Sequence, residues 1–179
     1  MSSTTTHAPE LSRIHLAGPW GGIGFLSFFF VGFWPLAHFL PGHDPAASAT
    51  AIAELYRSNA MGIRIGMVCL LLGAGCYLMF ITGVSALIRQ MEGGARYLSQ
   101  LQLASGAVAS VFLFAPAIFW GITAFRPERS PELTLLLNDA SWLLLITAVP
   151  PFVLQTVPLA VAILLSKTPL LPRWMSVLR

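Results

Sequence analysis

The polar residues that could form a binding site gather in two short segments of an otherwise apolar chain. One segment precedes the second long apolar run, and the other precedes the fourth. Their candidate ligand-binding residues are Arg57, Asn59, Arg64, Arg126, Glu128, Arg129, Asn138 and Asp139. The arginines could bind a lipid headgroup or an acidic partner, and we expect Arg64 to pair with Asp139 or Glu128. The alternative is that the whole group only caps helices, anchors the membrane interface and pairs internally.

The four histidines do not form the pattern of a metal or haem site. They are His7, His15, His38 and His43, and none lies in the last three long apolar runs. A haem in a membrane bundle needs axial ligands on facing helices, which one helix end cannot supply. His38 and His43 could touch one ion, but two ligands without a clustered carboxylate or cysteine are a weak signal. We therefore expect no metal and no cofactor.

Catalytic motifs are missing from the sequence. Ser27, Ser85, Ser105 and Ser110 lie in the apolar runs with no histidine or acid close in sequence, and neither Gly-x-Ser-x-Gly nor His-Glu-x-x-His occurs. An enzyme acting on lipids would need Asp139, Glu128 or His43 to converge on one cleft. We rank this function behind the two non-enzymatic ones given below.

The composition is that of a membrane protein. The 179 residues are 56% hydrophobic and only 9% charged, with a mean hydropathy of +0.76. A soluble domain carries about 25% charged residues, because a water-exposed surface needs charge for solubility. The net charge of +3 is too small and too scattered for a nucleic-acid partner, which needs a basic stripe.

Four long uncharged runs predict an all-α, polytopic membrane helix bundle. The runs cover residues 19–40, 65–88, 97–125 and 140–166. About 20 apolar residues span the hydrocarbon core, and a chain in lipid must satisfy its own backbone hydrogen bonds, so each run is expected to be a transmembrane helix. The domains are then a polar N-terminal segment (1–18), the four-helix bundle (19–166) and a basic tail with a tryptophan (167–179).

The connections between the runs predict further structure. Ile52, Leu55 and Tyr56 fall at helical spacing, which indicates a short helix in the membrane interface, capped by Asp44 or Ser48. Ser-Pro-Glu at residues 130–132 is typical of a helix start. Four prolines inside the last two runs predict bends: Pro116, Pro150, Pro151 and Pro158. They are either ordinary features of membrane helices or, at Pro150-Pro151, a functional hinge.

The distribution of Lys and Arg predicts which way the bundle faces. With four spans, both termini and the connection between the second and third runs share one side of the membrane. That side carries six of the ten basic residues, Arg13, Arg89, Arg96, Lys167, Arg173 and Arg179. Basic residues favour the cytoplasmic side, so we expect a multi-pass plasma-membrane protein with both termini in the cytoplasm.

Several motifs resemble those of a family of uncharacterised integral membrane proteins from actinobacteria. They are Tyr56-Arg57-x-Asn59, Ile63-Arg64-Ile65-Gly66, Phe125-Arg126-Pro127-Glu128-Arg129, Leu137-Asn138-Asp139, Pro150-Pro151-Phe152 and Pro172-Arg173-Trp174. The resemblance covers most of the chain from Ile52 onward. It implies a multi-pass helical fold and carries no catalytic residue across. Members of the family continue past Pro-Arg-Trp into further helices, so it also implies that this chain is a shortened form.

The leading functional prediction is a non-enzymatic membrane protein, either an accessory subunit or a binder of lipid, of an apolar ligand or of a membrane partner. The expected partners are membrane lipids, with another membrane protein or a second copy as further candidates. The first run offers an aromatic surface to such a partner or simply to lipid, formed by Phe25, Phe28, Phe29, Phe30, Phe33 and Trp34. The alternative is a transporter or permease for a neutral or hydrophobic solute, which a water-accessible cavity near Gln155 would support.

Overall fold

The computed structural model describes residues 17–42, 44–93 and 95–166, and all regular structure in these ranges is helical. In chain order the elements are α2 (Ala17–Val31), the π-helical turn η1 (Gly32–Leu36), α3 (Ala49–Ser58), α4 (Ala60–Met91), α5 (Tyr97–Phe125), α6 (Pro131–Ile146) and α7 (Val149–Leu165). The predicted basic tail, and all but the last two residues of the predicted N-terminal segment, lie outside the described residues.

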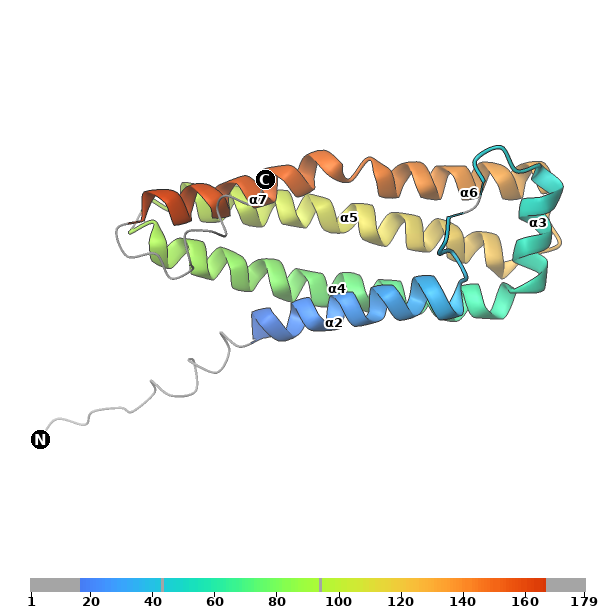
Figure 1. Ribbon diagram of the computed structural model, residues 1–179, viewed down its shortest axis with the longest axis horizontal. Coiled ribbons are helices and arrows are strands. Elements are labelled where there is room, and N and C mark those ends of the chain that lie inside the picture. The colour runs from blue at the N-terminus through green and yellow to red at the C-terminus, as the bar shows by residue number, and fades with distance from the viewer. Residues whose placement is uncertain (1–16, 43, 94, 167–179) are drawn as a thin grey trace, which may run out of the picture.

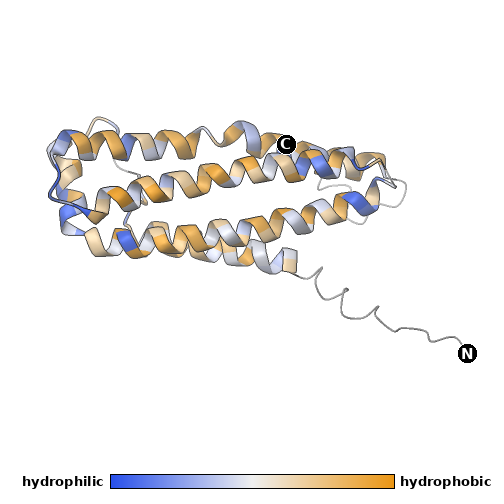
Figure 2. Ribbon diagram, turned by 180° about the vertical axis from the view of Figure 1, so that it is seen from behind, coloured by the Kyte–Doolittle hydropathy of each residue, from blue (hydrophilic) through white to orange (hydrophobic). Residues whose placement is uncertain are grey.

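Four stretches of helix are long and apolar enough to cross a membrane, as the uncharged runs predict. They are Ala17–Leu36, Ala60–Met91, Tyr97–Phe125 and Pro131–Leu165. They lie side by side along the long axis of the molecule, and α3 lies across one end (Figure 1). Hydrophobic residues cover the length of the bundle, and hydrophilic residues gather toward its ends (Figure 2). The protein is therefore a four-span membrane helix bundle with a short helix across one end.

Glycines allow α2 and α4 to pack closely. A Cβ atom on Gly66 would lie 2.6 Å from the carbonyl oxygen of Gly32, and a Cβ on Gly83 would lie 2.6 Å from Gly18 Cα. Lipid tails are as apolar as leucine, so membrane helices associate largely through such close van der Waals contact. Gly18 and Gly66 therefore lie where the backbones of α2 and α4 meet.

Aromatic rings fill the interior of the bundle near α3. The Phe33 ring lies 5.3 Å from the Trp120 ring of α5 and 5.8 Å from the Trp142 ring of α6, measured between centroids. Trp120 and Trp142 meet edge to face at 5.2 Å. Phe39 contacts both tryptophans and also Tyr56 of α3. This aromatic cluster joins four elements at one end of the bundle through favourable ring geometries.

The aromatic surface predicted for the first span is divided between the core and the outside. Phe30 and Trp34 are more than half exposed, whereas Phe33 is buried. Phe25 turns inward, with its ring centroid 5.2 Å from that of Tyr77 on α4. Contact with lipid or a partner is therefore open to Phe30 and Trp34, and not to the whole set.

The end of the first span and the start of the second differ from the predicted runs by several residues. The first span ends at Leu36 rather than at residue 40, because Pro35 has no N–H to donate and the last turn widens into a π-helical turn. His38 follows with a left-handed φ of 56°, a conformation that histidine adopts more readily than most residues. The second span begins earlier than predicted, at Ala60, so Arg64 lies inside its first turns.

Prolines interrupt one span and not the other. α5 runs unbroken through Pro116. The fourth span is interrupted at residues 147–148, directly before Pro150 and Pro151, and the break between α6 and α7 is visible in Figure 1. These two prolines have no N–H to donate to the preceding turn. The predicted bend is therefore confirmed for the fourth span, while the third shows no interruption.

Candidate ligand-binding site

α3 is held across the end of the bundle by its cap and by one buried face. Of the two predicted caps, Ser48 is the N-cap, and its Oγ accepts a hydrogen bond of 3.3 Å from the N–H three residues ahead. Asp44 stabilises the turn before it, where Oδ1 accepts from the N–H two residues ahead at 2.8 Å. Ile52 and Tyr56, whose spacing predicts the helix, are buried. The short helix predicted from this spacing is confirmed.

A chain of three side chains runs from the interior to the surface at this end. The buried Tyr56 hydroxyl donates to Asn138 Oδ1 at 3.0 Å. Because the oxygen of the Asn138 amide is taken, its nitrogen faces Asp139 and donates to Oδ1 at 3.4 Å. Asn138 is 4% exposed, whereas Asp139 is exposed. Buried polar contacts thus end at a carboxylate on the surface.

The surroundings of Tyr56 keep its phenol protonated. Burial raises the pKa of Tyr56 well above its usual range, and the negative charge of Asp139 raises this pKa further. A protonated phenol is a hydrogen-bond donor. The bond to Asn138 therefore persists into alkaline pH.

A cavity of about 390 Å³ opens beside this chain of side chains. Its walls come from the segment before α3, from α3 and from α6: Gly42, Asp44, Pro45, Ala47, Ile52, Leu135, Asn138, Asp139, Trp142, Leu143 and Ile146. Trp142 belongs to the cavity wall and also packs against the aromatic cluster. A mostly apolar wall with a few convergent polar groups is typical of small-molecule sites, and the volume lies at the lower end of their range.

The expected ion pair between Arg64 and Asp139 or Glu128 is absent among the described residues, so this expectation was wrong. Arg64 Nε donates instead to Ala124 O at 2.9 Å, and Nη2 donates to Phe125 O at 3.0 Å. These carbonyls belong to the last turn of α5, which lacks helical donors and carries the negative end of the helix dipole. The start of α4 therefore supplies a cation to the end of its neighbour, and no carboxylate is needed.

The other predicted arginines serve local structure or lie exposed. Arg129 Nη1 donates to a carbonyl of the last turn of α5, that of Ile122, at 2.7 Å. Arg57 lies 3.7 Å from Glu54 in a partly exposed pair on α3. Arg126 is exposed in the connection between α5 and α6, as is Glu128. A role for Arg126 in binding a headgroup stays a prediction.

Asn59 joins the end of the first span to the start of the second. Its Nδ2 donates to Leu36 O at 2.9 Å and lies 3.2 Å from His38 Nδ1. The structure thus divides the predicted site. Asn138 and Asp139 both line the cavity. Asn59 and Arg64, at the start of the second span, instead donate hydrogen bonds to the ends of the first span and of α5.

Asp44 and Trp142 line the cavity, although neither was predicted as part of a site. Asp44 is expected from the sequence only as a helix cap, and Trp142 lies inside an apolar run. A signal for Asp44 exists, because a helix that crosses the end of a bundle carries the residues before it toward the neighbouring span. Trp142 has no such signal, since an aromatic residue in a membrane run can face lipid, core or ligand alike.

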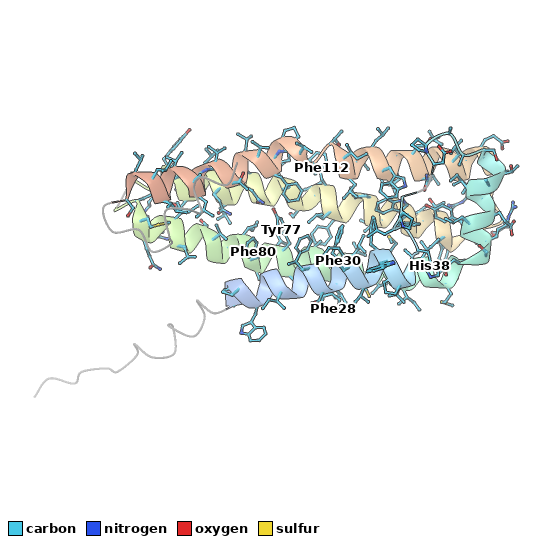
Figure 3. The ribbon with its side chains drawn as sticks, viewed as in Figure 1. Phe28, Phe30, His38, Tyr77, Phe80 and Phe112 are labelled. Atoms are coloured by element: carbon cyan, nitrogen blue, oxygen red, sulfur yellow. The ribbon has the colours of Figure 1, made fainter. Side chains whose placement is uncertain are left out.

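A further interhelical polar contact lies in the middle of the bundle, where Figure 3 shows Tyr77 between α4 and α5. The Tyr77 hydroxyl donates to Gln155 Oε1 at 2.5 Å and so joins α4 to α7. Gln155 also lies against α5, since a Cβ on Gly106 would be 2.8 Å from its Oε1. Gln102 Oε1 and Trp120 Nε1 are buried without a hydrogen-bond partner among the described residues.

Two further hollows, of about 280 and 470 Å³, lie where the start of α2 meets the end of α4. Gly18 and Gly83 line both, and the side chains around them are almost all apolar. They offer few polar groups that could orient a ligand. Across the part of the chain that the structure describes, no three His, Cys, Asp or Glu side chains are placed to hold a metal ion.

No family model, curated protein or solved structure matches this chain. Membership of the actinobacterial membrane family, which the sequence motifs imply, therefore stays a prediction. What the protein does has to follow from its own geometry, and the cavity beside α3 is the feature with the most chemical content.

Proposed function

We propose that this membrane protein is a non-enzymatic binder of an amphipathic membrane molecule, held in the cavity between α3 and α6. The observation that supports the proposal is the two-sided lining of that cavity. Ile52, Trp142 and Ile146 form part of an apolar wall, and Asn138 and Asp139 lie on its polar side. An amphiphile has the same two parts, because its tail gains by leaving water and its head requires hydrogen-bonding partners.

The position of the cavity along the bundle suits such a ligand. It lies beside α3 at a polar end of the bundle, where a membrane changes from hydrocarbon to headgroups. In the sequence, the two terminal segments and the connection between the second and third spans carry six of the ten Lys and Arg residues, which supports a plasma-membrane orientation with both termini in the cytoplasm. In that orientation the cavity opens at the outer face of the membrane.

Native mass spectrometry of the protein extracted in a mild detergent tests the proposal. We expect a homogeneous mass excess from one bound amphiphile, whose mass identifies it. Ala47→Phe places a ring in the cavity and should remove the excess, whereas Ala51→Phe, on the exposed side of α3, should retain it. A bare wild-type protein, or an excess that survives Ala47→Phe, contradicts the proposal. An excess equal to a second polypeptide assigns the accessory-subunit role instead.

The alternative function, transport of a neutral solute, has less support. A water-accessible cavity near Gln155 would support it, but the Gln155 Oε1 is bonded to Tyr77 and packed against α5. Gln155 lines none of the three cavities described above. The interruption between α6 and α7 is the feature that would permit movement.

An enzyme acting on lipids has less support again. It needs a carboxylate beside a histidine, and His38 lies against the amide of Asn59 rather than against Asp139 or Glu128. His43, the other histidine considered for this role, lies outside the described residues.

A further inference from the structure

The polar side of the cavity between α3 and α6 is acidic. Asp44 comes from the segment before α3, and Asp139 comes from α6. Among the described residues that line the cavity, none is basic. The two carboxylates therefore set the sign of the charge that a ligand meets there.

The arginines at this end of the bundle do not neutralise these carboxylates. Arg64 and Arg129 are bonded to carbonyls at the end of α5, and Arg57 is paired with Glu54. Within the described ranges, neither Asp44 nor Asp139 takes part in an ion pair. Their hydrogen bonds come from uncharged donors, a backbone N–H for Asp44 and the Asn138 amide for Asp139. Both carboxylates keep accepting capacity for a cation.

The apolar side of the cavity continues from Asp139 along a single face of α6. Trp142, Leu143 and Ile146 follow Asp139 at intervals of three, four and seven residues, and all four line the cavity. This spacing places them on one helix face over roughly 10 Å, at 1.5 Å per residue. A ligand with its charge at Asp139 can lay a hydrocarbon chain along Trp142 and Ile146. An ammonium group at that position also lies near an indole ring, which attracts cations.

We propose that the cavity takes an amphiphile whose polar end is a positively charged amine and whose remainder is a hydrocarbon chain. The inference rests on the proposed function and adds the chemical class of the ligand. The amine is either the headgroup of a membrane lipid or the end of a free long-chain amine, because both present the same ammonium group. An anionic headgroup would meet two carboxylates with no arginine available in the lining, and like charges at close range repel.

The test measures binding of three ten-carbon probes to the whole protein in an uncharged alkyl-maltoside detergent, with native mass spectrometry as the readout. The probes are decylamine, decanol and decyl sulfate. We expect decylamine to bind about two- to fivefold more tightly than decanol, as one partly exposed charge pair allows, and decyl sulfate to bind more weakly than either. Asp139→Asn should abolish the preference for decylamine, and Asp44→Asn should reduce it. Glu132→Gln, an exposed acid on the same helix outside the cavity, should leave the preference unchanged.

The outcomes separate this inference from the proposed function. Equal binding of decylamine and decanol by wild type, both lost in Ala47→Phe, overturns the amine preference and leaves the cavity as a binding site. Binding of no probe, with no excess mass in the purified protein, overturns both. An amine preference that survives both Asp139→Asn and Asp44→Asn also overturns the inference, because other groups must then supply it.

A second arm distinguishes the two sources of the amine. The protein is placed in nanodiscs of phosphatidylglycerol with a minor fraction of phosphatidylethanolamine, and the lipid retained on release is identified by mass. Enrichment of phosphatidylethanolamine, lost in Asp139→Asn, assigns the headgroup of a membrane lipid. A preference for decylamine without such enrichment assigns a free amine. Enrichment of phosphatidylglycerol over phosphatidylethanolamine contradicts the inference.

Discussion

The Tyr56 hydroxyl donates a 3.0 Å hydrogen bond to Asn138 Oδ1, joining two residues that are 82 positions apart in the chain. Both side chains are buried. This bond joins α3 to α6, the helix that supplies most of the cavity wall together with the residues just before α3. It also orients the Asn138 amide so that its nitrogen faces Asp139. The polar side of the cavity therefore depends on a contact between distant parts of the chain.

Loss of this bond should weaken the fold measurably. Tyr56→Phe removes the donor and leaves the buried Asn138 oxygen without a partner, which costs about 1–3 kcal/mol. We expect the free energy of unfolding, measured by denaturant titration in mixed micelles, to fall by that amount. Tyr97→Phe is the matched control, since Tyr97 is 68% exposed. Equal effects of the two substitutions would show that the bond to Asn138 contributes nothing.

Alkaline pH should reduce the stability that the folded protein gains from the protonated Tyr56 phenol. The pKa of Tyr56 is raised by burial and by Asp139, so the folded phenol keeps its proton after the unfolded phenol, with a pKa of about 10, has lost its own. Stability from this difference is complete below about pH 10 and is lost as the pH rises from there toward the folded pKa, by at most about 1.4 kcal/mol per pH unit. Unfolding curves of wild type and Tyr56→Phe between pH 9 and 11.5 should therefore converge. Parallel curves would contradict a raised pKa at Tyr56.

The close approach of α2 and α4 predicts opposite effects for two glycines of the same helix. Gly66→Ala puts a Cβ 2.6 Å from the Gly32 carbonyl oxygen, so the helices must separate, at a cost of about 1–3 kcal/mol. Gly75→Ala meets nothing within 4 Å and should stabilise α4 by about 0.5–1 kcal/mol. Denaturant titration of both variants checks the pair. A Gly66→Ala protein as stable as Gly75→Ala would disprove the packing of α2 on α4.

The contact of Arg64 with the end of α5 predicts a structural role for this arginine. Arg64→Gln loses the charge and the paired donors to the carbonyls of Ala124 and Phe125, so we expect the protein to be less stable by about 1–2 kcal/mol. Faster hydrogen exchange in the last turn of α5 should accompany the loss. Arg126→Gln is the control, because Arg126 is exposed and makes no such contact. If the free energy of unfolding is the same in Arg64→Gln as in wild type, the hydrogen bonds of Arg64 do not stabilise the fold, and its charge is again available for a ligand.

Local sequence patterns predict the spans and α3 well. The features that these patterns do not predict depend on contacts between residues far apart in the chain. Two predictions depend only on residues that are close in sequence, and the structure confirms both. They are the spans, from the long uncharged runs, and α3, from the spacing of Ile52, Leu55 and Tyr56. The partner of Arg64 depends on which helix end lies next to it. The short connection between α4 and α5 does predict antiparallel neighbours, so the end of α5 was a foreseeable partner. A carboxylate is only one kind of partner for an arginine, because the free carbonyls at a helix end also accept its hydrogen bonds.

The cavity itself could not be predicted in this way. It exists because α3 crosses the end of the bundle without filling the space between α6 and the described residues that precede α3. No single segment encodes that gap. Asn138 and Asp139 were predicted as site residues, but their place on an acidic cavity with an apolar wall depends on the packing of Trp142 against the aromatic cluster.

Photoaffinity labelling tests most directly whether the cavity binds an amphiphile. A decylamine analogue with a diazirine on its chain is bound at low occupancy, irradiated, and its attachment sites are mapped by peptide mass spectrometry. The proposed function predicts that label concentrates in residues 42–52 and 135–146 and disappears from them in Ala47→Phe. Label spread evenly over the exposed faces of α2 and α7, with no change in Ala47→Phe, would show that the protein meets amphiphiles only as it meets bulk lipid.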